Sequence, residues 1–265
     1  MFKDPRPLLK RHGLGAKKHH SQNFLISPRV VSVMASYARG TVLEVGPGVG
    51  TLTDALAERA ERVIAIEKDP SLCSVLEQEY SWANFEVINR DVLEGDLPAF
   101  DVCISSVPYA ISSPLLFKLL DEPFDTLVLL LQREFVDRLV GRGEPSRLTF
   151  MAQSMADARN VLAVPRTKFY PPPRVDSAVV EIVPNRKFEV DTWYRLTVEG
   201  LLTHKRKRVH NALVDSRAIF NKGKDEMKSI AKNAPHARTR VVELNIHEVR
   251  EIADYLDSEC FEKGG

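Results

Sequence analysis

The chain has 265 residues, of which 44% are hydrophobic and 28% charged, the composition of an ordinary globular protein. The formal net charge is only +1, and no apolar run approaches the ~20 residues that a membrane-spanning helix needs. Cys73, Cys103 and Cys260 form no CxxC pair, which argues against a disulfide framework or a zinc site. We therefore expect no metal site and a reducing, cytoplasmic setting.

The N-terminal segment MFKDPRPLLKRHGLGAKKHH has no apolar core and no small-residue cleavage site, so no secretory signal is expected. An organelle transit peptide stays open. The absence of serine and of a clear amphipathic period favours a mobile basic arm instead.

Charge is unevenly distributed along the chain. Residues 1–40 contain eight Lys or Arg and one Asp or Glu. Residues 41–100 contain four basic and twelve acidic residues, and residues 201–240 contain eleven basic and three acidic residues. A single charged run is usually solvated surface. Two basic regions around an acidic middle suggest a polyanion partner, and nucleic acid is the expected one.

Short β-branched runs alternate with helical patterns from residue 41 to about residue 183. Strands are predicted at 41–46, 62–67, 85–89, 101–105 and 126–132, and helices at 51–60, from Pro70 onward, and around 114–120. This alternation predicts an α/β fold, with a mostly parallel sheet covered by helices on both faces. Two further strands, 160–165 and 177–184, have no long helix between them, so we expect an antiparallel pair that completes the sheet.

The pattern changes after Pro184, where strand signals end and helical periodicity begins. Helices are predicted over Trp193–Asp215, near 218–231 and over 246–256. A small helical domain is therefore expected from about residue 190. The sequence contains no internal repeat and no low-complexity tract.

The strongest local signal is the sequence LEVGPGVGTLT at residues 43–53. Gly46, Gly48 and Gly50 follow a buried strand and precede a helix, as in loops whose backbone turns sharply against a ligand. A dinucleotide fingerprint would have glycine at position 51, where this chain has Thr51. Glu44 is unusual for such a site, and it could sense a cationic methionine group.

Two acidic residues extend this site. Glu67 ends the second strand, where a carboxylate can accept both ribose hydroxyls of an adenosyl group. Asp91 follows the third strand and could accept an adenine amino group. The alternatives are a surface acid beside a helix for Glu67 and a helix N-cap for Asp91. The carboxyl ends of parallel strands meet at one edge of a sheet, so this series of residues predicts a nucleoside cofactor site.

The segment ISSVPYAISSP at 104–114 follows the fourth strand and contains Ser106, Pro108 and Tyr109. An adenine amine is a poor nucleophile because its lone pair is delocalised into the ring, so positioning and hydrogen bonds to its N–H groups would supply the acceleration. Pro108 would stiffen the loop, and Tyr109 offers a flat face for an extruded base. A plain strand-to-helix turn with a buried tyrosine is the alternative.

Ser106-Val107-Pro108-Tyr109 resembles the Asn-Leu-Pro-Tyr motif of the ribosomal RNA adenine dimethyltransferases of the KsgA type. The resemblance covers nearly the whole chain. The segments that carry it are HSQNFLIS (20–27), VLEVGPGVGTLT (42–53), KFYPPPRVDSAVVEIVP (168–184) and HKRKRVHNAL (204–213). The ordered set is far more specific than any one of its motifs.

The resemblance implies a Rossmann-like methyltransferase that binds S-adenosylmethionine. The cofactor site it implies comprises Asn23, Leu25, Gly46, Gly48, Glu67, Asp91 and Ser106. It places the target base near Pro108, Tyr109 and Phe169. It implies as product two neighbouring adenosines near the 3′ end of small-subunit rRNA, each dimethylated at the exocyclic nitrogen.

With this resemblance the chain divides into three ranges. Residues 1–27 are the basic arm and a motif that covers the cofactor, 28–188 the catalytic domain, and 189–265 a helical domain that binds RNA or the ribosome. The partner would be small-subunit rRNA in a ribosomal or pre-ribosomal particle, and the protein would be a monomer without membrane contact.

Dense basic segments are the expected RNA contacts. Lys205, Arg206, Lys207 and Arg208 lie in a predicted helix, and Lys17 and Lys18 lie in the N-terminal arm. Such side chains cannot face a core, and contacts with phosphates would make binding salt-sensitive. None resembles a base-specific reader, so recognition by shape is expected.

One departure from the family pattern matters, because the family has asparagine where this chain has Ser106. A hydroxyl can still accept an N–H, but its arm is shorter, and losing one well-placed acceptor costs on the order of 1–2 kcal/mol. The alternatives are therefore a catalytically weak or inactive ribosome assembly factor with this fold, and a NAD-dependent dehydrogenase. Thr51 and the Pro-Tyr loop argue against the dehydrogenase.

Overall fold

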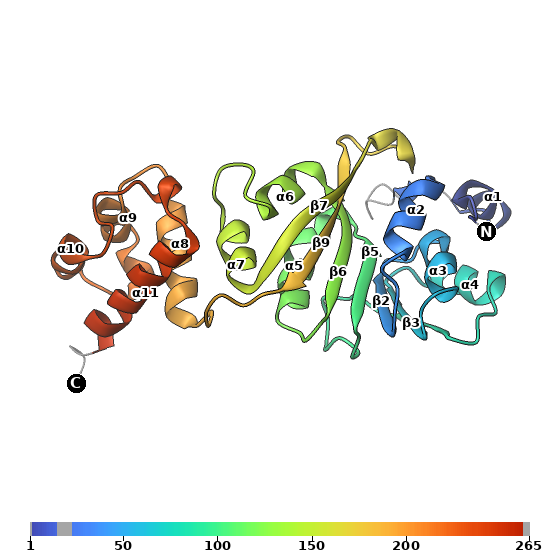
Figure 1. Cartoon of the computed structure of the whole chain (residues 1–265), viewed down its shortest axis with the longest axis horizontal. Helices are drawn as coiled ribbons and strands as arrows, with labels where there is room; N and C mark the ends of the chain where they lie inside the picture. Colours follow the sequence, from blue (N-terminus) through green and yellow to red (C-terminus); the bar gives the residue numbers. More distant parts are fainter. Residues whose placement is uncertain (1, 15–22, 262–265) are drawn as a thin grey trace. The chain divides into compact units, whose positions relative to one another are not determined.

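The computed structural model describes residues 2–14 and 23–261. Within it the chain forms two compact units, Met1–Val140 with Asp157–Pro184, and Gly141–Ala156 with Asn185–Gly265. The first unit carries the sheet, and the second is helical (Figure 1). No helix among the described residues is long and apolar enough to cross a membrane.

The first unit is built on a seven-stranded sheet with the order β4-β3-β2-β5-β6-β9-β7. Its strands are β2 (Thr41–Val45), β3 (Arg62–Glu67), β4 (Phe85–Asn89), β5 (Val102–Ser106), β6 (Thr126–Gln132), β7 (Ala156–Val164) and β9 (Ser177–Pro184). Strands β2 to β6 run parallel, whereas β9 is antiparallel to β6 and forms an antiparallel pair with β7. The predicted α/β sheet, including its antiparallel end, is confirmed.

Helices cover both faces of this sheet. They are α2 (Pro28–Ala35), α3 (Thr51–Ala57), α4 (Pro70–Glu79), α5 (Ser112–Leu120) and α6 (Arg133–Leu139). On one face, Val42 and Val128 pack with Met34 of α2 and Leu56 of α3 in a single core cluster. Leu43 is the strand neighbour of Val42, faces the other way and is fully buried too. Burial on both faces explains why these strands read as continuous apolar runs.

The chain leaves β2 for β3 and β4 on one side and returns to β5 on the other. The strand order therefore reverses between β2 and β5. In open α/β sheets, ligands bind at such a reversal, outside the carboxyl ends of the strands.

The N-terminal arm contains a docked helix, so the expectation of a mobile arm is wrong for its described part. Helix α1 (Pro5–Arg11) begins at Asp4, whose side chain accepts the Arg6 N–H. Its Leu9 packs with residues of α4 in a separate core cluster, and His12 Nε2 lies 2.7 Å from Glu79 Oε1. The apolar contacts of Leu8 and Leu9 and the polar contacts of Arg11 and His12 with Glu79 together fix its position.

A second sheet, not predicted from sequence, consists of β1 (Phe24–Leu25) and β8 (Phe169–Tyr170). The two strands are antiparallel, with Phe24 opposite Tyr170 and Leu25 opposite Phe169. This ladder joins two motifs that lie more than 140 residues apart in the chain.

The helical unit contains α7 (Arg147–Met155), α8 (Thr192–Thr203), α9 (Val209–Asp215), α10 (Lys224–Asn233) and α11 (Ile246–Phe261). Its core includes the fully buried Tyr194, whose hydroxyl lies 2.7 Å from Ser154 Oγ of α7. The segment Gly141–Ala156 thus clusters with the C-terminal helices although it lies inside the range 28–188. The two compact units therefore do not coincide with the ranges 28–188 and 189–265 that were predicted from sequence.

The predicted helix over Trp193–Asp215 is interrupted, which corrects the placement of the basic run. His204–Arg208 form the loop between α8 and α9. The backbone of this loop pairs with a distant segment, since Val241 N–H donates to Lys207 O (3.0 Å) and Val242 N–H to Lys205 O (3.2 Å). These long-range bonds outweigh the local preference for helix.

Candidate active site

The glycine loop connects β2 to α3 at the point where the strand order reverses. Gly48 has φ +62°, and a Cβ placed on it would lie 3.1 Å from the Phe24 ring. A side chain here would both strain the backbone and displace Phe24. Gly46 faces the next segment of the site, because a Cβ on it would lie 3.4 Å from Pro108 Cγ.

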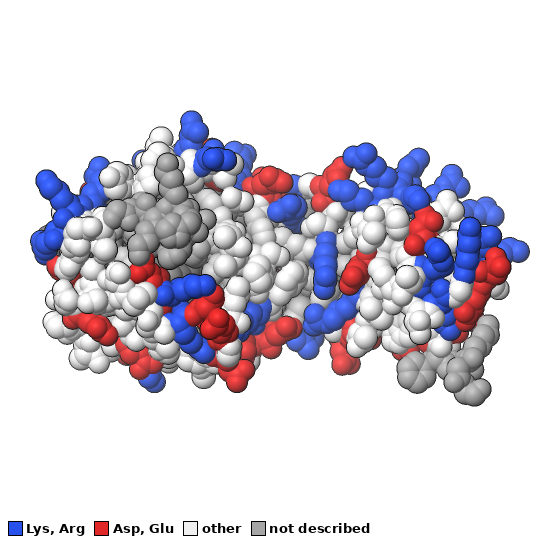
Figure 2. All heavy atoms as spheres, turned by 180° about the vertical axis from the view of Figure 1, so that it is seen from behind, with Lys and Arg blue, Asp and Glu red and all other residues white. Residues whose placement is uncertain are grey.

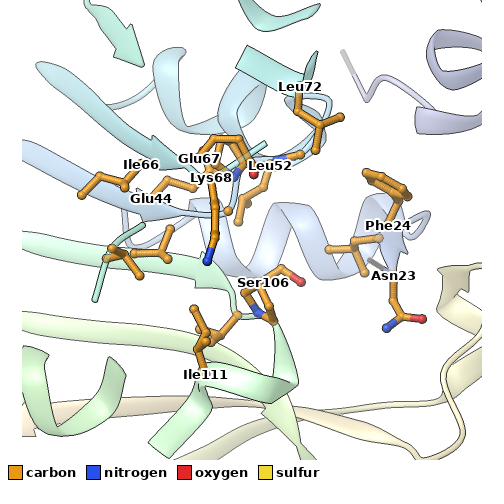
Figure 3. Close-up of a pocket in the computed structure, with 18 of the residues that line it drawn as sticks. Asn23, Phe24, Glu44, Leu52, Ile66, Glu67, Lys68, Leu72, Ser106 and Ile111 are labelled. Atoms are coloured by element: carbon orange, nitrogen blue, oxygen red, sulfur yellow. Dashed lines mark hydrogen bonds between the residues drawn. The ribbon is translucent and has the colours of Figure 1, made fainter. Parts of the chain in front are cut away.

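A cavity of about 320 Å³ lies along the carboxyl ends of the parallel strands (Figure 3). A volume of this size is typical of small-molecule sites. Every residue predicted from sequence for the cofactor or the target base lines it: Asn23, Leu25, Gly46, Gly48, Glu67, Asp91, Ser106, Pro108, Tyr109 and Phe169. The structure therefore brings all ten positions to one cavity, although their individual roles stay predictions.

The sequence analysis missed the apolar lining of the cavity. It includes Leu52, Ile66, Leu72, Val92 and Ile111. Two of these residues, Ile66 and Val92, directly precede Glu67 and follow Asp91 in the chain. Apolar neighbours of a predicted ligand acid were the available signal, but they could not be told from core residues without the fold.

Glu67 is a buried carboxylate at the end of β3. Its Oε1 accepts the Asp69 N–H at 2.9 Å, and its Oε2 accepts the Gly48 N–H at 3.2 Å. Burial raises the pKa of Glu67, and these two backbone donors oppose the rise. The contacts fix Glu67 against the glycine loop and leave lone pairs for further donors, since a carboxylate can accept about four hydrogen bonds.

Asp91 lies after β4 and is held by two donors. The Lys68 ammonium is 2.7 Å from Oδ2, and the Leu93 N–H donates to Oδ1 at 2.9 Å. The hydrogen bond from Lys68 lowers the pKa of Asp91, so this carboxyl is ionised at neutral pH. The backbone bond closes a turn and caps no helix, which rules out the helix-capping alternative for Asp91.

Glu44 lies within β2, is 2% exposed and also lines the cavity. The Thr53 hydroxyl donates to its Oε2 at 2.7 Å. Burial raises the pKa of Glu44 to about 8. The cavity therefore holds a carboxyl that is mostly neutral at pH 7 and that a cationic ligand would help to ionise.

Thr51 places a buried hydroxyl at the wall of the cavity. Its hydroxyl is buried, lines the cavity and has no hydrogen-bond partner among the described residues. A buried hydroxyl without a partner is costly, on the order of 1–3 kcal/mol. A ligand with polar groups on this side of the cavity would remove that cost.

The loop after β5 forms the other end of the cavity (Figure 3). Its position is fixed by the Ser105 hydroxyl, which donates to Val45 O at 2.6 Å, and by the Val107 N–H, which donates to Leu130 O at 3.2 Å. Tyr109 is half-buried, and its hydroxyl lies 2.5 Å from Ser177 Oγ at the start of β9. Ser106, Pro108 and Tyr109 are thus held on a rigid loop beside the glycine loop.

Comparison with known proteins identifies the family. A sequence model described as "Ribosomal RNA adenine dimethylase" matches residues 13–257. The chain belongs to this family. It is 41% identical to the "Probable ribosomal RNA small subunit methyltransferase A" of Thermococcus onnurineus, over 94% of this chain and 95% of the relative. It is also 41% identical to the protein of that name from Pyrococcus furiosus, over 94% of each chain.

Solved structures agree with this assignment. A dimethyladenosine transferase from Plasmodium falciparum superposes with a TM-score of 0.76 at 27% identity, covering 89% of this chain and 98% of that one. The 23S rRNA methyltransferase ErmE superposes with a TM-score of 0.68 at 27% identity, covering 89% and 100%. The sequence-based assignment to an rRNA adenine dimethyltransferase is confirmed.

Members of the family use S-adenosylmethionine, and the cavity fits this cofactor. Its apolar walls suit an adenine ring, Glu67 presents carboxylate oxygens for ribose hydroxyls, and the cavity contains a buried carboxyl and an unpaired hydroxyl. Glu44 and Thr51 would face the polar, cationic part of the ligand. The donor set therefore matches the cofactor that the family implies.

Phe169 is more enclosed than a base-stacking role suggests. It is 3% exposed and belongs to the core cluster that includes Leu25, yet it also lines the cavity. Its neighbour Tyr170 is 46% exposed, because alternate residues of a strand face opposite sides. A role for Phe169 in stacking the target base stays a prediction.

The predicted RNA contacts are not among the residues that line the cavity. Lys205 pairs with Glu144 and Lys207 with Asp215, whereas Arg206 and Arg208 are exposed cations of the same loop. Lys17 and Lys18 lie outside the described residues. Lys205–Arg208 belong to the helical unit, and the cavity belongs to the other.

Proposed function

We propose that the enzyme dimethylates the N6 amines of two adjacent adenosines near the 3′ end of small-subunit rRNA, within a ribosomal or pre-ribosomal particle. One observation carries this proposal. A single cavity extends from the acidic residues Glu67 and Asp91 to the loop Ser106–Tyr109. Cofactor and target base can therefore meet in one cavity, in a chain that is 41% identical to proteins named probable ribosomal RNA small subunit methyltransferase A.

The end of the cavity that contains Glu67 and Asp91 would orient the cofactor. When bound, S-adenosylmethionine supplies a methyl group activated by the positive charge on its sulfur. Glu67, held by the Gly48 and Asp69 N–H groups, would accept the ribose hydroxyls. Asp91, ionised beside Lys68, would accept the adenine amino group of the cofactor.

The other end prepares the target amine. The Ser106 hydroxyl would accept one N–H, which favours the pyramidal amine whose lone pair is free to attack. The Tyr109 ring would stack against the extruded base, with Phe169 as a second apolar surface. Tyr109 donates to or accepts from Ser177, so its ring is fixed before the base arrives. Orientation of this kind accounts for the acceleration without a covalent enzyme intermediate.

A catalytically weak assembly factor is the alternative that Ser106 suggests, since the family motif has asparagine there. The fixed Tyr109, the Glu67 contacts and the unpaired Thr51 hydroxyl support an active site. We further propose that the protein acts as a monomer in the cytoplasm. Its free cysteines, including the buried Cys73 and Cys103, are compatible with a reducing compartment.

The test is transfer of labelled methyl from S-adenosylmethionine to unmodified small subunits, followed by nucleoside analysis of the rRNA. Dimethyladenosine at two adjacent positions is the expected product. Fully methylated subunits are the matched control and should take up no label. If the protein binds both cofactor and subunits but transfers nothing, the assembly-factor function replaces this one.

A further inference from the structure

The segment that follows β4 presents two residues to the catalytic cavity. We call residues 91–96 the cofactor turn. Asp91 and Val92 line the cavity, and no residue of this described turn belongs to a helix or a strand. An irregular segment has no ladder or helix to pair its backbone carbonyls, so other groups of the protein must do so. The positions of Asp91 and Val92 therefore depend on what holds this turn.

A lysine from a different element holds the middle of the cofactor turn. Lys118 belongs to α5, the helix that follows the Ser106–Tyr109 loop. Its ammonium group donates to Val92 O at 2.7 Å and also to Gly95 O. Hydrogen bonds from a charged donor are roughly twice as strong as neutral ones. Lys118 thus ties the turn to α5, although it is not itself among the residues that line the cavity.

A second cation holds the rest of the turn. Arg90, the last residue before the turn, donates through Nη1 to Glu94 O at 3.2 Å and through Nη2 to Asp96 O. Gly95 makes room for this guanidinium, because a Cβ on Gly95 would lie 3.1 Å from Arg90 Nη1. Gly95 also has φ +63°, a conformation that favours glycine. Four carbonyls of one short turn therefore accept hydrogen bonds from two cations.

These two side chains differ from the usual surface cation. Figure 2 shows many Lys and Arg side chains that project from one face of the molecule. Lys118 and Arg90 are instead partly buried, and the hydrogen bonds above direct them to backbone oxygens. Burying part of a charged group is costly unless it is paired, so these carbonyl contacts account for the positions of both cations.

Lys118 also acts on Asp91 through its charge. The hydrogen bond from Lys68 is the main reason that the pKa of Asp91 is low, and the nearby charge of Lys118 lowers it further. An ionised Asp91 is a pure acceptor, which suits an amino group and repels a carbonyl oxygen. The contacts that fix the turn therefore accompany a charge that favours its reading form.

We propose that Lys118 and Arg90 are positioning residues for the cofactor. By holding the cofactor turn through its carbonyls, they would fix Asp91 and Val92 in the geometry that recognises adenine rather than another purine. The proposal rests on the proposed function for the contact between Asp91 and the adenine amino group. The sequence analysis singled out neither cation.

Lys118→Met is the decisive variant, because it removes both donors and keeps the length of the side chain. Lys118 does not line the cavity, so any effect on the ligand must pass through the turn. Lys118→Arg keeps donors for two carbonyls and should restore most of the lost affinity. Lys222→Met is the matched control, since Lys222 is another partly buried lysine, paired with Glu226 in the helical unit.

The measurement is calorimetric binding of two ligands. One is S-adenosylhomocysteine, and the other is S-inosylhomocysteine, in which a carbonyl oxygen replaces the 6-amino group and the ring N1 carries a proton. Wild type should prefer the adenine ligand. Lys118→Met should bind that ligand about tenfold more weakly, the equivalent of one good hydrogen bond, and lose little affinity for the inosine ligand. The ratio of the two affinities should therefore fall about tenfold, and Lys222→Met should keep the ratio of wild type.

A second variant keeps the proposal testable if Lys118→Met does not fold, which thermal unfolding would show. Gly95→Ala pushes against Arg90 from within the turn, and Gly95 does not line the cavity either. Gly13→Ala has the same kind of backbone strain (φ +62°) and lies outside the turn. The affinity ratio should fall in Gly95→Ala alone. An unchanged ratio in folded Lys118→Met or Gly95→Ala, or an equal loss for both ligands, would overturn the proposal.

The same experiment separates this proposal from the proposed function, because binding of these ligands needs neither RNA nor methyl transfer. A wild type that does not distinguish the two ligands would remove the role of Asp91 and the proposal with it. A wild type that prefers adenine, with the same preference in folded Lys118→Met, would overturn the positioning role alone. A fall of the ratio in a protein that transfers no methyl group would support the positioning role and leave the catalytic proposal to fail by itself.

Discussion

The Tyr109 hydroxyl and Ser177 Oγ lie 2.5 Å apart and join the loop after β5 to the first residue of β9. Ser177 is fully buried, and the bond as a whole is part-buried because Tyr109 lines the cavity. It fixes the plane of the half-buried Tyr109 ring at the cavity wall. The antiparallel end of the sheet therefore positions a side chain of the reacting site.

Removing either partner of this bond should slow methyl transfer without weakening cofactor binding. Ser177→Ala and Tyr109→Phe each remove a hydrogen bond worth about 0.5–1.5 kcal/mol, which corresponds to a loss of about 2- to 12-fold in single-turnover rate. The double variant should be no slower than the slower single variant, because both changes remove the same interaction. Additive losses would show that Tyr109 and Ser177 act independently.

Glu44 should make the stability of the cofactor-free protein depend on pH. In the folded state burial raises the pKa of Glu44 from an ordinary 4.5 to about 8. Between these values the folded state binds more protons than the unfolded state, so the free energy of unfolding falls as the pH rises. The contribution of Glu44 to this fall is at most ~1.4 kcal/mol per pH unit.

The Glu44→Gln variant isolates this effect because its amide cannot ionise. The free energy of unfolding of the variant minus that of wild type should increase from about pH 5 to about pH 8 and then level off. Urea unfolding at several pH values measures it. Glu67, the nearby carboxyl that raises the pKa of Glu44, is present in both proteins, so its titration largely cancels. A difference that does not change with pH would mean that Glu44 is ionised in the folded state.

The positions of Glu67 and Asp91 were predictable from sequence because they depend on strand order alone. Carboxyl ends of neighbouring parallel strands must meet at one edge, so acids that follow β3 and β4 must share a site with the loop after β2. The same reasoning placed Ser106 there. These inferences needed only the alternation of strands and helices.

Features that depend on long-range backbone pairing were not predictable. The basic run 204–208 has helical composition, but its backbone bonds to residues 241–242, which no local pattern reveals. Phe169 and Tyr170 are adjacent aromatic residues, and without the family resemblance no local pattern tells which of them is buried. Pairing of β8 with β1 buries the first and exposes the second. The register of this pairing decides which of the two residues is buried, because a shift by one residue exchanges the two faces of a strand.

Ser106 should be replaceable by the family's residue without loss. Ser106→Asn offers a longer acceptor and should keep or raise the single-turnover rate of methyl transfer. Ser106→Ala removes the acceptor and should raise the activation free energy by on the order of 1–2 kcal/mol, which lowers the rate about 5- to 30-fold. The family resemblance also places Ser106 in the cofactor site, so cofactor affinity is measured by calorimetry and the rates are compared at saturating cofactor. A large drop in the rate of Ser106→Asn would show that the role given to Ser106 is wrong.

Phe169 should affect turnover through its ring rather than through its volume. Phe169→Ala would open a hole in the core at a cost of about 3–5 kcal/mol, so Phe169→Leu is the informative variant. Loss of stacking should raise the activation free energy of methyl transfer by about 1–3 kcal/mol, and cofactor affinity should change little. Tyr170→Leu, next to it but on the exposed face, is the matched control for loss of an aromatic ring. Weakened cofactor binding by Phe169→Leu would indicate a purely structural role.

Gly48→Ala should weaken cofactor binding beyond the cost of backbone strain. Gly48 and Gly13 both have φ +62°, so alanine at either position is strained by about 1–3 kcal/mol. Among the described residues, a Cβ on Gly13 meets no atom within 4 Å, whereas one on Gly48 lies 3.1 Å from the Phe24 ring, which lines the cavity. Denaturant unfolding should show the strain in both variants, and calorimetry should show loss of S-adenosylmethionine affinity in Gly48→Ala alone. Equal affinity in the two variants would mean that Phe24 moves aside freely and that the Gly48 backbone does not closely approach the cofactor.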